Sequence, residues 1–132
     1  MMTSWQQRQI AEWPMVESVS HLLLKTIKET PLDEDKEWVL EVIREAAEML
    51  PASILEGQES EYLAEFILGV SAARNAAVIA AYCFNFLRGE GLMDAAKADD
   101  IEAQLDELEL ALASLTEALR RDLSNQRRFA NN

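Results

Sequence analysis

Apolar side chains recur every three or four positions along four long segments of the chain, whereas no segment alternates apolar and polar residues as a half-buried strand does. This pattern predicts four α-helices, at about residues 15–29, 34–56, 61–87 and 95–124, and therefore an all-α fold. The positions expected to face the core are Val16, Val19, Leu23 and Ile27; Val39, Ile43, Ala46, Leu50 and Ile54; Leu63, Phe66, Ile67 and Val70; and Ile101, Leu105, Leu108, Leu112, Leu115 and Leu119. Short connections force neighbouring helices to run in opposite directions, so we expect an antiparallel up-down-up-down four-helix bundle.

Capping and helix-breaking residues mark the expected ends of these helices. An Asp at position 33 or 35 is available as the N-cap of the second helix, and Ser60 as the N-cap of the third. Gly57 is expected to end the second helix in a left-handed conformation. Pro51 interrupts the same helix, and because the apolar seam continues through it we expect a kink rather than a break.

The four helices make one domain at residues 13–124, preceded by an N-terminal extension at residues 1–12 and followed by a frayed tail at residues 125–132. A chain of 132 residues, 49 % of them apolar, can bury a sufficient core without disulfides or metals. The single cysteine excludes an intrachain disulfide, and the N-terminal sequence lacks the basic and apolar stretches of a secretory signal. The sequence therefore predicts a cytoplasmic protein.

The third helix is unusual because residues 76–87 are apolar on every side, and such a helix is normally buried on every side. The run from residue 66 to residue 87 has one charge, Arg74, and approaches the length of a membrane span. A central Arg costs on the order of 3 kcal/mol on insertion. We therefore expect no membrane span but a core helix with Arg74 paired to a carboxylate and its outer face against a second subunit. The candidate interface residues are Val78, Ile79, Tyr82 and Phe86.

Acidic residues outnumber basic ones two to one: the chain has 24 Asp and Glu, 12 Lys and Arg, and a net charge of −12. This balance argues against broad binding to nucleic acid, because phosphate contacts come from Lys and Arg. The basic residues cluster near the C-terminus. The candidates for a nucleic-acid contact there are Arg120, Arg121, Arg127 and Arg128.

Residues that often carry catalysis are scarce. His21 is the only histidine, which excludes a ferritin-like di-iron bundle with its two Glu-x-x-His motifs, and we expect it on a helix surface. Cys83 lies among aromatic residues without a His or second Cys to activate it, so we expect a small core residue. The sequence therefore predicts a protein that is not an enzyme and that uses no cofactor and no metal.

Glu45 and Glu48 form an E-x-x-E on the second helix that resembles the metal-binding carboxylates of all-α nucleoside triphosphate pyrophosphatases. Those enzymes use a further E-x-x-D on the following helix, and no such pair follows here. Since hard cations are bound by carboxylates, a Mg²⁺-dependent all-α hydrolase stays a minor alternative.

The segment VIREAAEMLPASILEG, at residues 42–57, resembles the I-R-x-A-A-x-x-I-P-x-x-I-x-E-G signature of the four-helix-bundle proteins encoded in 23S rRNA intervening sequences. The matching residues are Ile43, Arg44, Ala46, Ala47, Pro51, Ile54, Glu56 and Gly57. The upstream segment MVESVSHLLLKTIKETP and the downstream segment LDELELALASLTEAL fit other helices of that family, so the resemblance covers about residues 13–121.

The resemblance implies a bundle without catalytic activity that assembles into a homo-oligomer, commonly a pentameric ring. A related branch, the accessory variability determinants of diversity-generating retroelements, is similar in fold and acts as a basic ring that binds a reverse transcriptase and its RNA. This chain departs from the family in its net charge and in the apolar run at residues 76–81. Within the signature, Arg44 is expected to pair with Glu48 or Glu56.

The sequence therefore favours a self-associating scaffold or adaptor, whose first partner is another copy of the chain and whose further partner is a protein. The alternative is an accessory RNA- and reverse-transcriptase-binding protein of a diversity-generating retroelement, which would use the C-terminal arginines. The net charge of −12 disfavours RNA as a partner.

Overall fold

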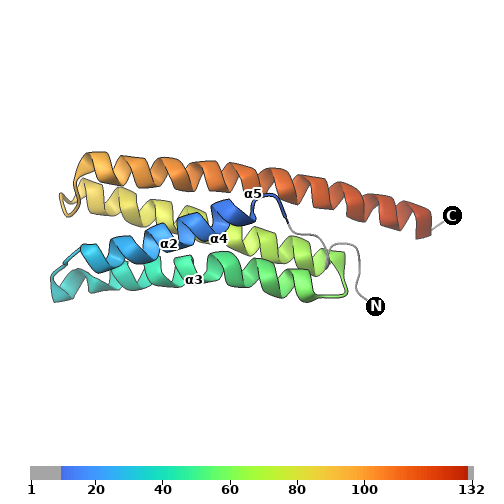
Figure 1. Cartoon of the computed structure of the whole chain (residues 1–132), viewed down its shortest axis with the longest axis horizontal. Coiled ribbons are helices and arrows are strands. Elements are labelled where there is room, and N and C mark those ends of the chain that lie inside the picture. Colours follow the sequence, from blue (N-terminus) through green and yellow to red (C-terminus); the bar gives the residue numbers. More distant parts are fainter. Residues whose placement is uncertain (1–9, 131–132) are drawn as a thin grey trace.

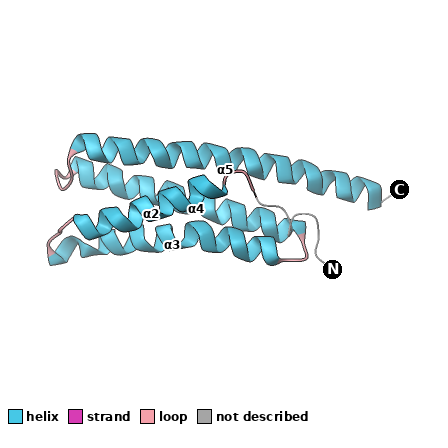
Figure 2. Ribbon diagram, viewed as in Figure 1, coloured by secondary structure: helices cyan, strands magenta, loops and turns pink. Residues whose placement is uncertain are grey.

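The computed structural model of the protein describes residues 10–130, and these form four α-helices and one turn of 3₁₀ helix, with no strand among them. The four helices lie side by side in an elongated bundle, and successive helices run in opposite directions (Figure 1). Only short connections join them (Figure 2). The predicted all-helical bundle of four helices is confirmed for the single chain.

The helices are α2 (Trp13–Glu29), α3 (Glu37–Glu59), α4 (Leu63–Gly89) and α5 (Ala95–Ala130), and the 3₁₀ turn η1 (Glu34–Lys36) precedes α3. α4 packs extensively against both α3 and α5, and α2 packs mainly against α3. α2 and α5 share few contacts, and α2 is the shortest helix, covering only part of the length of the bundle (Figure 1). α3, α4 and α5 therefore form a continuous wall with α4 in its middle.

Every apolar position that the sequence predicts to face the core is buried. The stripes are spaced three and four residues apart, which places their members on one side of each helix. The largest fully buried side chains are Phe66 and Phe84, both on α4. α4, which packs extensively against both α3 and α5, therefore supplies the largest side chains of the hydrophobic core.

The connection between α4 and α5 is a tight turn that depends on Gly91. This residue has a φ of 70°, in the left-handed region that favours glycine. The N–H of Leu92 donates to the carbonyl of Leu87 at 2.9 Å, which closes the end of α4 as in a Schellman motif. Asp94 then caps α5, because its carboxylate accepts the N–H of Lys97 at 3.2 Å.

Two of the predicted caps are wrong in detail. Asp33 makes no side-chain cap; its carbonyl accepts the N–H of Lys36 at 2.8 Å and so closes η1, after which α3 begins. Ser60 lies two residues before the actual N-cap of α4, Tyr62. Its hydroxyl accepts the N–H of Tyr62 at 3.1 Å and donates to the carboxylate of Glu65, so it still orders the start of the helix.

α5 is the longest helix and extends past the others at one end of the bundle (Figure 1). Its 36 residues span about 54 Å, against about 40 Å for the 27 residues of α4. The helix continues to Ala130, where the sequence predicts a frayed tail from residue 125. No Gly or Pro follows Gly91 to break it, and Arg127 and Arg128 in its last turns complement the helix dipole. The predicted extension at residues 1–12 lies mostly outside the described residues.

Candidate functional site

Exposed apolar side chains concentrate on the outer surface of α3 and α4. Trp38 and Met49 lie eleven residues, or about three turns, apart on α3; Leu68 and Ile79 have the same spacing on α4, where Tyr82 follows. Their exposed fractions run from 46 % at Ile79 to 71 % at Tyr82. They are five of the eight large apolar side chains that are exposed in the described part of the chain. We call these five residues the outer apolar face.

Contacts across the α3–α4 seam hold this face together. The ring of Trp38 lies 5.8 Å from the ring of the half-buried Phe86, between centroids. Met49 and Leu68 border a hollow of about 420 Å³. The outer apolar face therefore spans both helices, with apolar side chains brought together at two places along the seam.

Glycines bring α3 and α4 unusually close beside this hollow. A Cβ on Gly57 would lie 2.8 Å from the carbonyl oxygen of Glu65, and a Cβ on Gly69 would come closer still to the carbonyl of Ser53. The left-handed conformation predicted for Gly57 is wrong: it lies inside α3, and among the described residues only Gly91 has a positive φ. Gly57 is needed for its missing side chain.

A buried hydrogen bond compensates for Pro51 inside α3. Proline has no N–H, so the carbonyl of Ala47, four residues earlier, loses its helical donor. The hydroxyl of Ser20 on α2 donates to that carbonyl at 2.7 Å, and both residues are buried. The α-helix continues through Pro51, and α2 supplies the missing bond.

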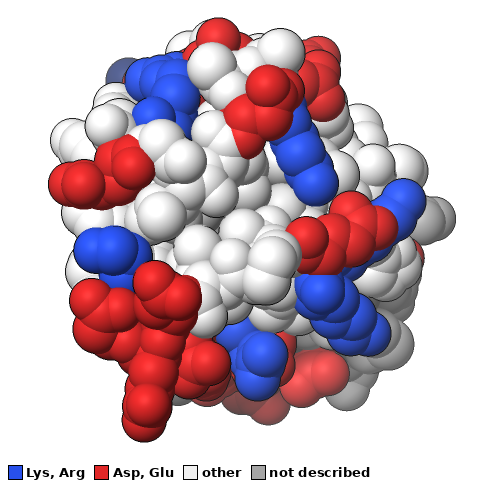
Figure 3. Space-filling view, turned by 90° about the vertical axis from the view of Figure 1, so that its left-hand side faces the viewer, with Lys and Arg blue, Asp and Glu red and all other residues white. Residues whose placement is uncertain are grey.

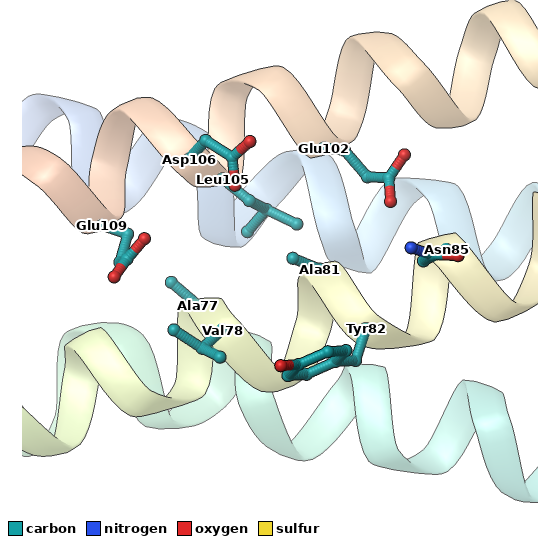
Figure 4. A pocket seen from close by; sticks show the side chains of 9 residues that line it. All are labelled: Ala77, Val78, Ala81, Tyr82, Asn85, Glu102, Leu105, Asp106 and Glu109. Atoms are coloured by element: carbon teal, nitrogen blue, oxygen red, sulfur yellow. The ribbon is translucent and has the colours of Figure 1, made fainter.

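A groove lies on the other side of α4, where an open space of about 380 Å³ separates it from α5. Figure 4 shows the carboxylates of Glu102, Asp106 and Glu109 along α5, with Leu105 between them and Tyr82 on the α4 side. We call these three carboxylates the acidic wall. Tyr82 belongs both to this groove and to the outer apolar face, so the two features adjoin.

Two arginines on α4 pair with the acidic residues of α5. Arg74 lies 3.3 Å from Glu109, as the sequence predicts for a carboxylate partner. Arg88 pairs with both Asp99 and Glu102. The hydrogen bond to Asp99 is the main cause that raises the pKa of Arg88 above its ordinary value. These pairs align α4 with α5, and the exposed Arg74–Glu109 pair adds little stability in water, whereas the Arg88–Glu102 pair is partly buried.

The C-terminal part of α5 is the basic counterpart of the acidic wall. Residues 120–128, which we call the basic arm, contain four Arg and one Asp. All of these side chains are exposed, and only Leu123 in the arm is half-buried. None of the four arginines forms an ion pair with another described residue, and the same holds for Asp106 of the acidic wall.

The end of the bundle opposite the basic arm has a different character. Figure 3 looks onto that end, where the α2–α3 and α4–α5 connections lie, and shows an uncharged centre with charges of both signs around it. Acidic side chains gather on one side of this view. The α2–α3 connection, which lies at this end of the bundle, contains the exposed acids Asp33, Glu34 and Asp35.

The residues of the family-like signature are mostly structural. The buried ones are Ile43, Ala46, Ala47, Ile54 and Gly57. Pro51 is half-buried, whereas Arg44 and Glu56 are exposed. The predicted pairing of Arg44 with Glu48 or Glu56 is wrong, because Arg44 pairs with Glu41, one turn earlier, at 3.7 Å. Packing of α3 explains most of the signature without a binding role.

The four interface candidates on α4 divide into two groups. Ile79 and Tyr82 are exposed, whereas Val78 and Phe86 are half-buried against their neighbours. The structure adds Trp38, Met49 and Leu68 to them; the sequence indicated Trp38 as a packing or interface anchor, but Met49 and Leu68 were missed. Their spacing of eleven residues, along each helix, is the signal that would have identified the face.

The residues considered for catalysis lie on three different helices. His21 is exposed on α2, and Cys83 is buried, which raises the pKa of its thiol and disfavours the reactive thiolate. Glu45 and Glu48 are both exposed on α3. Within residues 10–130 there is no group of three or more His, Cys, Asp or Glu side chains placed to hold a metal ion.

Among the described helices, α4 alone is long and apolar enough to cross a membrane by length and composition. About 44 % of its most apolar 18-residue window is buried inside the bundle. The core helix of a bundle can be equally long and apolar, so length and composition do not distinguish it from a membrane-spanning helix.

The chain was also compared with known proteins. No protein-family model matches it, and no curated protein sequence matches it either. The interpretation of the site therefore depends on its own geometry.

Proposed function

We propose that this protein is a non-enzymatic, self-associating helical bundle that serves as a scaffold or adaptor. The observation that carries the proposal is the outer apolar face, where Trp38, Met49, Leu68, Ile79 and Tyr82 are exposed together on two adjacent helices. Contiguous apolar surface of this kind usually marks an interaction site, because its burial is favourable by about 25 cal/mol per Å². A second copy of the chain is the simplest cover.

The family resemblance of residues 42–57 supports the same function. Under this proposal the protein belongs with the bundle proteins of 23S rRNA intervening sequences and forms a homo-oligomeric ring in the cytoplasm, with five subunits as the expected number. His21, Cys83 and the Glu45–Glu48 pair lie on three different helices, which supports a role without catalysis.

Molar mass by light scattering, measured over a range of micromolar concentrations, tests self-association. We expect a multiple of the 14.9 kDa chain mass for the unaltered protein. Tyr82→Glu should shift the mass toward the single chain, because it places a charge in the contact. Tyr62→Glu is the matched control, since Tyr62 is similarly exposed but lies at the α3–α4 connection. A single-chain mass for the unaltered protein would overturn the proposal.

The second candidate function is an accessory RNA-binding protein. It is favoured by the four exposed arginines of the basic arm, which could contact phosphates. Filter binding to single-stranded and duplex RNA at low and high salt is the test. Phosphate-driven binding is strongest at low salt, so no binding there would remove this candidate.

A further inference from the structure

The basic arm and the acidic wall are opposite in charge and similar in length, although Glu102 and Glu109 of the wall also pair with Arg88 and Arg74 of the same chain. The arm arginines lie at positions 120, 121, 127 and 128, and because seven residues are nearly two turns, all four lie on one side of α5. They span about 12 Å along the helix, at 1.5 Å per residue. Asp122 lies on the opposite side, so it does not interrupt this stripe.

The acidic wall has the complementary pattern. Glu102, Asp106 and Glu109 follow one another at spacings of four and three residues, which places them along one side of α5 over about 10 Å. Asp106 has no cationic partner among the described residues. The groove beside it has an apolar floor that includes Ala77, Ala81 and Leu105.

One chain cannot join its own arm to its own groove. Both lie on the same straight helix, and residue 106 is about 27 Å from residue 124 along it. The arm also extends beyond the end of the bundle, away from the groove (Figure 1). A contact between the two features therefore requires two copies of the chain.

We propose that the basic arm of one copy docks in the α4–α5 groove of a second copy, with the arm arginines facing the acidic wall. This inference rests on the proposed self-association and specifies its geometry. The outer apolar face supplies most of the affinity, and the arm and groove fix the relative orientation, as complementary charges do in interfaces. Tyr82 borders both surfaces, so one neighbour covers both.

The contact joins two different surfaces, so each copy docks its basic arm on one neighbour and receives the basic arm of another neighbour in its groove. Such a head-to-tail contact repeats from copy to copy. It closes into a ring when the rotation between successive copies divides a full turn evenly. A face-to-face dimer through the outer apolar face is less favourable, because it brings the exposed acidic side chains Glu41, Glu45, Glu48 and Glu56 of two α3 helices into the same interface.

Charge reversal tests the docking. The arm variant carries Glu at all four arginine positions of the arm; the groove variant is Asp106→Lys with Glu109→Lys. We expect each variant alone to associate at least about tenfold more weakly than the unaltered protein at low salt, because like charges then meet. Mixing the two variants should restore association, since each arm again faces a groove of opposite sign. Far-UV circular dichroism checks that both variants remain helical.

The outcomes separate this inference from the proposed function. If the unaltered protein associates and both variants associate as strongly, the arm-in-groove contact is overturned while self-association stands. Weakened variants that do not recover on mixing also overturn it. If the unaltered protein is a single chain, both proposals fail. Raising the salt from about 0.05 M to about 0.5 M should weaken the unaltered assembly, because a charge-guided contact is screened.

Discussion

α2 and α4 differ in what they expose, although each buries a continuous apolar stripe. The outward side of α2 is polar, with Glu17, Ser18, His21, Lys25 and Lys28 all exposed. α2 therefore meets water as the outer helix of a soluble bundle normally does.

The outward side of α4 carries Leu68, Ile79 and Tyr82 instead, and its most apolar stretch is less than half buried in the single chain. The inner apolar stripes of both helices are buried in the core of the bundle, whereas these outer residues of α4 are exposed. α2 therefore completes the surface of one chain, whereas under the proposed self-association the outer residues of α4 are covered by a neighbour.

Matched leucines on the two helices give the largest expected contrast in stability. Leu23→Ala on α2 removes a fully buried side chain and should lower the free energy of unfolding by about 3 kcal/mol. Leu68→Ala on α4 removes a side chain that is 67 % exposed, and should change it by less than about 0.5 kcal/mol. Urea unfolding at low protein concentration measures both. Equal losses of unfolding free energy in the two variants would contradict the difference between the buried stripe of α2 and the outer side of α4.

A methyl group at the α3–α4 crossing should have the next largest effect. Gly69→Ala forces its Cβ against the carbonyl of Ser53, so we expect a loss of about 2 kcal/mol in unfolding free energy. Gly89→Ala is the control, because a Cβ there meets nothing within 4 Å, and it should be neutral or stabilising by up to about 1 kcal/mol. If both variants melt alike, the close approach of the helices does not constrain α4.

The hydrogen bond from α2 to α3 should contribute somewhat less. Ser20→Ala leaves the buried carbonyl of Ala47 without a donor, which costs about 1–2 kcal/mol. In a Pro51→Ala variant, residue 51 again has an N–H that can donate to the carbonyl of Ala47. Ser20→Ala should then lower the free energy of unfolding by only about 0.5 kcal/mol. A double-mutant cycle by thermal or urea unfolding gives the coupling. Additive effects would show that the hydroxyl does not compensate for the proline.

The Arg74–Glu109 ion pair between α4 and α5 should matter least for folding. Arg74→Gln breaks an exposed pair with Glu109 and should cost at most about 0.5 kcal/mol. Its measured stability should also depend less on salt than that of the unaltered chain. A loss above about 1 kcal/mol would mean that polar contacts contribute more to the α4–α5 packing than their exposure suggests.

The repeating pattern of apolar residues was sufficient to predict the four helices and their buried stripes. It succeeded because the period of apolar positions is local, and each of the predicted stripes is long and regular. The pattern also indicated that residues 76–87 are apolar on more sides of the helix than a single bundle can cover. Ile79 and Tyr82 are exposed in that segment.

Contacts between residues on different helices could not be predicted from the local pattern of apolar residues. Gly57 resembles a helix-ending glycine in sequence, but its role is set by the α4 backbone at Glu65, Phe66 and Gly69. Pro51 makes it certain that Ala47 loses a donor, yet nothing local identifies Ser20 as the replacement. The outer apolar face is likewise a property of two packed helices.

Chemical reactivity of the two tyrosines tests the central claim most directly, because Tyr82 and Tyr62 are 71 % and 67 % exposed in the single chain. Hydroxyl-radical footprinting of the unaltered protein should find Tyr82 several-fold less reactive than Tyr62 at micromolar concentration. The two should become equally reactive on dilution, when copies separate. Equal reactivity at high concentration would contradict the account, because it would mean that no neighbour covers α4.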